Sequence, residues 1–210
     1  GKQPPDKGPK GNRRNGGDPV DLSTGLFVHE HVDAFLDDSV PIVLSRVYRQ
    51  NDPNTRMFGS GTSSPYDMFL WSANQYTEVD LILPDGGRVH YVRTSPGSSY
   101  DDAVFDAQAT SSMFFRSRIS WDAALFGWNL SMRDGTVLRF PAFVPLTEIV
   151  DPNGNVTTIR RNDSKIITQV TSPNGRWVRV SSDASGRATQ LLDNIGRRTT
   201  YAYDAQRSEE

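Results

Sequence analysis

Apolar and polar residues alternate along this chain with a period of two. In the segment 77–83, large apolar side chains stand at the alternate positions Val79, Leu81 and Leu83. Successive side chains of a strand point to opposite faces, so this spacing predicts strands with one buried face. The clearest runs are 77–83, 126–133 and 197–203, and only 101–109 shows a weak helical pattern. We predict an all-β fold of many short antiparallel strands joined by hairpins.

Turn-forming residues separate these runs at short intervals. Glycine adopts a positive φ without steric cost, and Asn and Asp tolerate it, so clusters of Pro, Asp, Asn and Gly close hairpins. Such clusters occupy residues 84–87, 95–97, 133–135, 151–154 and 172–175. The chain is therefore expected to fold as a series of hairpins.

One short motif recurs in the last third of the chain. An Asp is followed three positions later by Gly and then by Arg or Asn, and the glycines are Gly154, Gly175, Gly186 and Gly196. Ser172 replaces the Asp in the second copy, and the last run ends in Tyr201-Ala202-Tyr203-Asp204. A unit of about ten residues cannot bury its own apolar face, so such units must stack on neighbours. We expect the stack to continue beyond Glu210.

These repeats are similar to the tyrosine–aspartate (YD) repeats of the Rhs, or rearrangement-hotspot, family. The segment before them resembles the domain that introduces those repeats. Its opening motif corresponds to Asp18-Pro19-Val20 with Gly25, and its Arg-x-Tyr strand to Arg46 and Tyr48. Thr62 stands where the family has a Trp after a Gly-x-Gly turn. The motif positions further along the chain are Trp128, Asp134, Gly135, Gly154, Gly175, Gly186, Arg187, Gly196, Arg197, Tyr201, Tyr203 and Asp204.

The resemblance implies a function. Rhs proteins resemble hollow shells in which a long β-sheet spirals round an interior that holds a toxin, and bacteria deliver them by type VI secretion, insecticidal toxin complexes or related routes. By this resemblance the chain is the structural start of such a β-shell, with no catalytic residue and no cofactor. Its partners would be the rest of the shell, the enclosed toxin, and a secretion spike or chaperone. The protein would be a secreted bacterial effector, cytoplasmic before export.

The order of the motifs divides the chain into four parts. Residues 1–17 form a basic linker or strap, 18–145 the β-domain that caps the shell, 146–204 the first repeats, and 205–210 a tail. In the repeats, Tyr201 and Tyr203 are expected to stack against residues of adjacent strands. Arg187, Arg197 and Arg198 are expected to bond to the next unit.

Composition and charge limit the classes of site and partner that this chain can have. The chain has 210 residues, no Cys and a formal net charge of −2; residues 1–17 hold five Lys or Arg and one Asp, so +4, which leaves −6 for the rest. The absence of Cys excludes disulfides, zinc–thiolate sites and cysteine nucleophiles. No apolar run predicts a membrane span, and no charged-then-apolar leader is present. An acidic body without basic–aromatic interleaving argues against nucleic acid as a partner.

Three groups of polar residues could carry chemistry. His29, His31 and Asp33 stand at alternate positions and would share one strand face, a spacing that suits a metal ion. No fourth ligand is identifiable, so we expect these residues to form an ordinary strand surface. The pairs 37–38 and 101–102 are adjacent Asp residues, whose side chains point to opposite faces of a strand. Only a pairing between the two groups would bring carboxylates face to face, as hydrolysis requires.

Two other functions stay open. A surface binding module for glycans or receptors would expose aromatic side chains on one face, with Trp121 and Trp177 as the residues to test. A hydrolase or metalloenzyme would use His29, His31 and Asp33. We prefer the structural interpretation because the runs and turns suit a stacked wall of strands. It predicts that this chain exposes an apolar sheet edge or pairs with another chain through it.

Overall fold

The computed structural model describes residues 28–49, 54–108 and 113–204. Every regular element in those ranges is a strand, and the predicted all-β class is confirmed. The weak helical pattern at 101–109 does not lead to a helix among the described residues, because β9 (Val104–Ala107) forms there and buries Phe105. No stretch of the described residues forms a helix able to span a membrane.

The first strands of the chain form a small sheet. β1 (Val28–Leu36) and β2 (Ile42–Arg49) make a hairpin, and β5 (Thr62–Ser63) pairs with the other edge of β2. β3 (Thr55–Arg56) and β4 (Gly59–Ser60) form a separate two-stranded ladder. The register of the β1–β2 hairpin shifts between Val32 and Ala34, so Asp33 is the extra residue of a β-bulge.

All remaining strands belong to one sheet of 13 strands in strict chain order. Each strand pairs antiparallel with the next, because short turns allow no other connection. The strands are β6 (Phe69–Trp71), β7 (Glu78–Ile82), β8 (Arg88–Arg93), β9, β10 (Arg118–Asp122), β11 (Gly127–Ser131), β12 (Val137–Pro141), β13 (Glu148–Val150), β14 (Val156–Arg161), β15 (Ile167–Thr171), β16 (Trp177–Ser182), β17 (Ala188–Asp193) and β18 (Arg198–Thr200).

The recurring motif closes the hairpins of this sheet. In the turn after β16, Asp183 Oδ1 accepts hydrogen bonds from the backbone N–H groups of Ser185 and Arg187, both at 2.9 Å. Gly186 has a φ of +82°, which glycine adopts without strain. Equivalent bonds form at Asp151 and Asp193. The motif is therefore a turn in which the Asp carboxylate satisfies two backbone donors.

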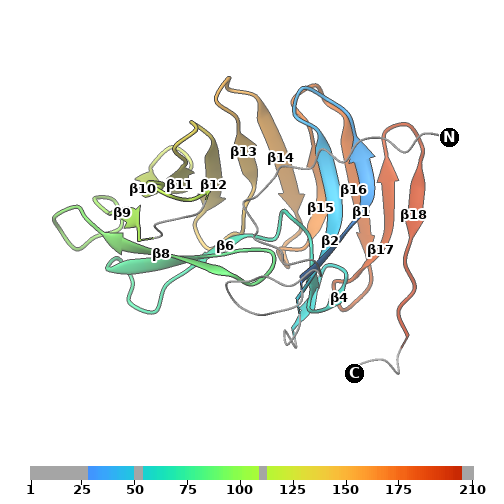
Figure 1. The fold of residues 1–210 in the computed structure, drawn as a ribbon, viewed down its shortest axis with the longest axis horizontal. Coiled ribbons are helices and arrows are strands. Elements are labelled where there is room, and N and C mark those ends of the chain that lie inside the picture. Colours follow the sequence, from blue (N-terminus) through green and yellow to red (C-terminus); the bar gives the residue numbers. More distant parts are fainter. Residues whose placement is uncertain (1–27, 50–53, 109–112, 205–210) are drawn as a thin grey trace.

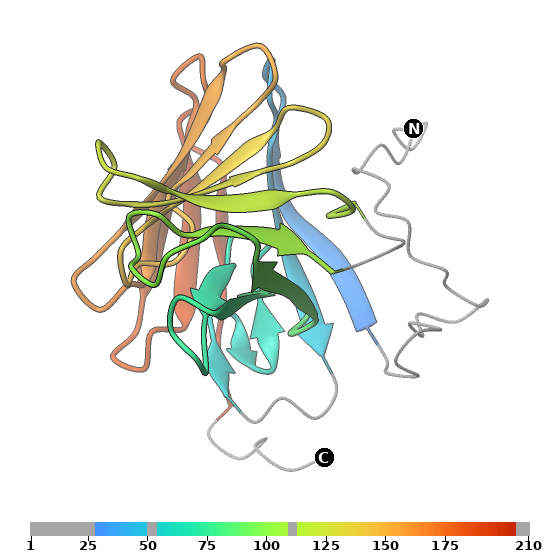
Figure 2. The same cartoon turned by 90° about the vertical axis from the view of Figure 1, so that its left-hand side faces the viewer.

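The large sheet is strongly curved (Figure 1, Figure 2). β6, β7 and β8 lie below β10–β12, and the β1–β2 hairpin stands in front of β15–β17. One hydrophobic core fills the concave side, which we call the inner face. This core includes Leu44 of β2 together with Val170, Val178 and Leu191 of the repeats. The small sheet therefore covers the inner face of the repeat strands.

The two faces of the repeat strands differ in polarity. Ile159, Val170 and Val178 point inward and are buried. The alternate positions Arg160 and Arg179 are exposed on the other face. This is the alternation that a sheet with one solvated face requires. The sheet also continues across residue 145, where we placed a domain boundary, since β12 and β13 pair with each other.

Candidate functional site: the junction of the two sheets

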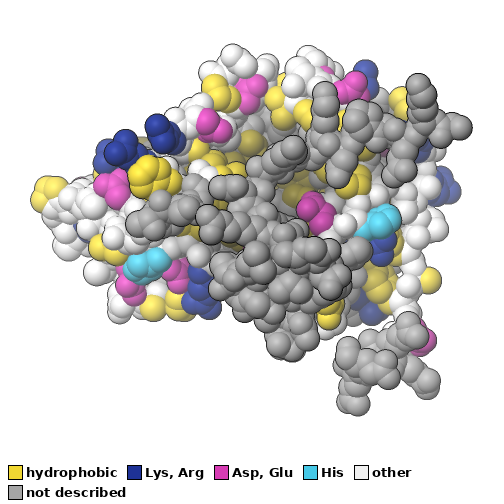
Figure 3. Space-filling view, viewed as in Figure 1, with side chains coloured by type: hydrophobic (Ala, Val, Ile, Leu, Met, Phe, Trp, Pro, Cys, Tyr) yellow, Lys and Arg dark blue, Asp and Glu magenta, His cyan; other side chains and the backbone are white. Residues whose placement is uncertain are grey.

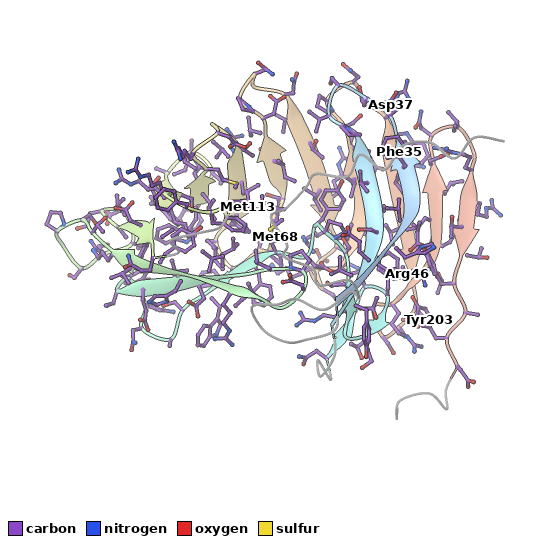
Figure 4. All side chains as sticks on the ribbon, viewed as in Figure 1. Phe35, Asp37, Arg46, Met68, Met113 and Tyr203 are labelled. Carbon is purple, nitrogen blue, oxygen red and sulfur yellow. The ribbon has the colours of Figure 1, made fainter. Side chains whose placement is uncertain are left out.

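The turn between β1 and β2 contacts the repeat sheet through Asp38 and Ser39. Asp38 accepts hydrogen bonds from the hydroxyl of Ser172 and the side-chain amide of Asn174, both in the β15–β16 turn. These bonds, that from Ser172 first, hold the pKa of Asp38 below its ordinary value. The contact lies toward the end of the hairpin where Figure 4 labels Phe35 and Asp37. It joins residues 134 positions apart in the sequence.

Ser172 is the position that departs from the repeat motif. Elsewhere the first residue of the turn is an Asp whose own carboxylate accepts backbone hydrogen bonds, as at Asp183. Ser172 supplies a hydroxyl donor instead, and the carboxylate comes from Asp38 of the other sheet. An Asp at position 172 would set two carboxylates against each other. The irregular repeat thus binds the turn of the amino-terminal hairpin.

This arrangement predicts the effect of restoring the motif. We expect Ser172→Asp to lower the melting temperature by several degrees, because like charges would meet at Asp38. Ser172→Ala removes only the hydrogen bond and should lower it less. Thermal unfolding followed by circular dichroism measures both, and Asp38→Asn should restore part of the loss in the Ser172→Asp background. Equal melting temperatures for the two single variants would contradict the charge argument.

Two more hydrogen bonds connect the amino-terminal segment to the last repeats. The Arg197 guanidinium donates to the backbone carbonyl of Phe35 at 2.9 Å. The Ala188 N–H donates to the carbonyl of Met57 at 2.7 Å. Arg197 also bonds to Asp193 of its own turn, as Arg187 does to Asp183. The predicted role of these arginines in bonding to the next unit is thus replaced by contacts within the turn and with the small sheet.

The Tyr-x-Tyr ending of the last repeat packs against the amino-terminal segment. The ring of Tyr201 lies 5.3 Å from that of Phe58, between ring centroids. Tyr203 donates to the carbonyl of Ala188 at 2.7 Å, and the Arg187 guanidinium covers its ring at 4.5 Å. The predicted stacking on equivalent residues of adjacent strands does not occur. Regular pairing in β18 ends at Thr200, three residues before the predicted end of the strand.

The backbone conformation at Gly59, beside Tyr203, requires glycine. Its φ of +109° lies in the region that favours glycine. A Cβ atom built there would lie 3.5 Å from the ring of Tyr203. That is an ordinary van der Waals distance, so the φ of Gly59, and not the space beside Tyr203, is the reason for glycine here.

A charged group lies beside the two tyrosines, on the bulge of β1. The Arg46 guanidinium is 2.8 Å from Asp33 Oδ2, and His31 Nδ1 is 3.2 Å from Asp33 Oδ1. Burial first, and then the negative charge of Asp33, raise the pKa of Tyr201. Figure 4 shows Arg46 and Tyr203 on the same side of the molecule, next to β1 and β17. The structure thus brings together motif residues from both halves of the chain.

A buried arginine forms the third connection. Arg161 donates to three backbone carbonyls, those of Leu146 at 3.1 Å, Lys165 at 2.9 Å and Tyr66 at 2.8 Å. Its guanidinium is 3.6 Å from Asp67 Oδ1. Burial raises the pKa of Asp67, and the charge of Arg161 opposes that rise. Arg161 and Asp67 line a cavity of about 420 Å³, where each is the ion-pair partner of the other.

The predicted metal ligands do not assemble a site among the described residues. The carboxylate of Asp33 is held by Arg46 and His31. The side chain of His29 lies outside the described residues. Within the described ranges no group of three His, Cys, Asp or Glu side chains is placed to hold a metal ion.

The two carboxylate pairs lie in different parts of the molecule. Asp38 binds the β15–β16 turn, whereas Asp102 accepts a hydrogen bond from Arg93 of β8 at 2.5 Å. Figure 1 shows β8 and β15 at opposite sides of the fold. The pairing that hydrolysis would require is therefore not formed.

The other motif positions either take part in contacts within the fold or lie outside the described residues. Asp18, Pro19, Val20 and Gly25 lie outside the described residues. Trp128 of β11 contacts Trp121 across the hairpin, and Asp134 accepts from the Thr136 N–H in the turn that contains Gly135. Tyr48 pairs with Thr62 between β2 and β5. Asp204 is exposed after the last strand.

Comparison with known families gives one match. Residues 17–91 match the family model of a domain of unknown function (DUF6531). The matched range ends within β8, so it covers the small sheet and the first strands of the large sheet but none of the repeats. No curated protein matches the chain.

Buried tyrosines make the fold sensitive to alkali. Burial raises the pKa of Tyr66 and of Tyr91 from 10.0 to about 12 each. A raised pKa in the folded state means that the neutral phenol contributes stability, fully present below the unfolded pKa and lost as pH rises through the folded pKa. The urea midpoint should therefore fall between about pH 10 and about pH 12. A midpoint constant over that window would contradict this expectation.

Proposed function

We propose that this chain is a wall segment at the start of an Rhs-type shell that encloses a toxin. One observation carries the proposal: 13 strands follow one another in chain order in a single sheet, and no described strand pairs with the free edge of β18. Such a meander grows by adding strands at its edge without changing those already placed. An unpaired edge accepts another strand or is a liability for aggregation.

The junction supports the same function. A wall needs a fixed beginning, because the first strands of a stacked sheet have no earlier unit to pack on. Here the β1–β2 hairpin covers the inner face of the first repeats, and Asp38 and Arg161 connect the amino-terminal segment to the repeat strands.

On this proposal the chain performs no catalysis. Its activity is enclosure: the wall separates a cargo protein from the cytoplasm until delivery, and residues 1–17 link the wall to a spike or chaperone. The enclosed toxin and further repeats are its partners, and the protein is exported as a bacterial effector. The sequence similarity to YD repeats and the geometry of the turns support this interpretation.

Imaging the complete gene product tests the proposal. Cryo-electron microscopy should show a closed β-shell in which a strand pairs with β18 and density fills the interior. A Ser172→Asp variant of the same product should assemble fewer intact shells, while Arg179→Gln, on the outer face, serves as the control. A complete product that is a monomeric globule, with β18 unpaired and no enclosed density, would overturn the proposal.

A further inference from the structure

Four aromatic side chains meet at the end of the molecule opposite the junction. We call Tyr76, Tyr100, Trp121 and Phe126 the aromatic patch. Their ring centroids lie 6.2 Å apart for Tyr76 and Tyr100, 4.7 Å for Tyr100 and Trp121, and 5.3 Å for Trp121 and Phe126. Tyr76, Tyr100 and Phe126 come from three separate turns, those before β7, before β9 and between β10 and β11, and Trp121 comes from strand β10. Figure 3 shows hydrophobic side chains at the surface of this end, among charged ones.

The patch is exposed although aromatic rings gain most from burial. The exposed fraction is 36% for Tyr76, 40% for Tyr100 and 64% for Phe126. Trp121 lies behind them and contacts Trp128, whose ring packs on buried Phe105. The rings are therefore held in fixed positions by the core and presented outward.

The backbone at two of these residues adopts a conformation that normally selects glycine. Phe126 has a φ of +49° and Tyr76 a φ of +63°. For a bulky residue a positive φ is an outlier that costs conformational energy. The N–H of Phe126 bonds to the carbonyl three residues earlier, as the N–H of Gly186 does in its turn. A turn that the repeats close with Gly is closed here with an exposed Phe.

A third aromatic residue repeats the pattern beside the patch. Phe143 has a φ of +62° and an exposed fraction of 92%. The adjacent Ala142 N–H donates to the carbonyl of Phe126 at 3.0 Å, so the two turns are neighbours. Exposed aromatic residues at a positive φ depart from local backbone preferences, and such departures are expected at functional sites.

The surroundings of the patch identify the class of ligand. Asp101 and Asp102 are exposed beside Tyr100, and the Arg93 side chain is turned inward onto Asp102 and four backbone carbonyls. Exposed carboxylates repel nucleic acid and anionic lipid but accept hydrogen bonds from hydroxyl groups. Four partly exposed rings also offer less area than the ~800 Å² per partner of a stable protein interface. Aromatic rings with a few polar groups are the usual lining of a small-ligand site.

We infer that the aromatic patch binds a neutral oligosaccharide. The apolar faces of the sugar rings would stack on Tyr100 and Phe126, and their hydroxyls would donate to the carboxylate of Asp101. This inference goes beyond the proposed wall function and does not depend on it. Of the two tryptophans that the sequence offered for glycan binding, Trp121 lies in this patch and supports its exposed rings, whereas Trp177 is covered by the Arg179 guanidinium at 4.2 Å.

One substitution separates binding from folding. Phe126→Gly removes the ring and relieves the positive φ, so the melting temperature should stay the same or rise. The affinity of the chain for cellohexaose, chitohexaose or maltohexaose, whichever binds best by isothermal titration calorimetry, should fall at least tenfold. Lys165→Gly is the matched control, because Lys165 has a φ of +66° in a turn without an aromatic ring. It should leave the affinity unchanged.

The same experiment can overturn the inference. Absence of binding to all three hexasaccharides at millimolar concentration contradicts it, and so does equal affinity of Phe126→Gly and the parent chain. Heparin, phosphatidylglycerol vesicles and sedimentation velocity complete the test. Loss of polyanion binding, of vesicle binding or of a dimer on Phe126→Gly would assign the patch to a different partner and overturn the glycan assignment.

Discussion

Arg161→Met is expected to lower the free energy of unfolding by about 3–5 kcal/mol, the range for breaking a buried ion pair by removing one partner. The side chain of Arg161 is 5% exposed and donates to the carbonyls of Tyr66, Leu146 and Lys165. Met fills a similar volume but leaves three carbonyls without this donor and Asp67 without its nearest cation. Urea unfolding at neutral pH measures the loss.

The pH dependence of this variant identifies the mechanism. Without Arg161, the pKa of Asp67 should rise further above its ordinary value, because the group that most opposes the effect of burial is gone. A raised folded-state pKa gives stability below the unfolded pKa that is lost as pH rises. The variant should therefore be closest to the parent protein in mild acid, and Asp67→Asn should recover part of the loss at neutral pH.

A neighbouring arginine provides the control. Arg160 is exposed on the outer face, and Arg160→Met should change the free energy of unfolding by no more than about 0.5 kcal/mol, as is usual for surface substitutions. If Arg161→Met behaved like Arg160→Met, the buried arginine would not connect the two sheets as its contacts indicate.

Leu44→Ala should lower the free energy of unfolding by about 3 kcal/mol, within the 2–5 kcal/mol typical of buried Leu-to-Ala changes. Leu44 in β2 is fully buried in the core that also holds Val170 and Val178 of the repeats. The cavity would open between the two sheets. Val32→Ala, on the same hairpin but 51% exposed, is the matched control and should have little effect.

The form of the unfolding curve decides whether the sheets act as one unit. A shared core predicts a single transition in the parent protein and in the Leu44→Ala variant, with protection from hydrogen exchange lost together in β2 and β16. Early loss of protection in β2 alone, with β16 unaffected, would show that the hairpin is an independent addition. The proposed function as the start of a wall requires that the two sheets unfold as one unit.

Local sequence patterns predicted the fold class because they act over short distances. The alternation at Val79 and Leu81 gives a strand whose buried face can be read from the sequence, and both residues are buried in β7. Glycine at positive φ marks the repeat turns, where φ is +82° at Gly154 and Gly175. The weak helical pattern at 101–109 does not lead to a helix among the described residues, because burial of Phe105 between two strands outweighs it.

Most of the candidate site could not be predicted. The sequence marked Ser172 as an irregular repeat, and that departure was the available signal for a docking point. Nothing local indicated that Asp38 would be its partner, because the two are joined only when the hairpin lies across the repeat sheet. Asp33 was read as a possible metal ligand, yet a bulge turns it toward Arg46.

The sequence by itself determined the local structure. It set the periodicity of the strands and the closure of the turns, and it contains an Asp-x-x-Gly unit that cannot bury its own apolar face. Tertiary structure alone decided which distant segments meet. The last tyrosines pack on Phe58 and Gly59, and Arg161 connects segments on both sides of the core. The physical reason is that turn and strand preferences arise within a few residues, whereas burial and ion pairing depend on which surfaces the curled sheet brings together.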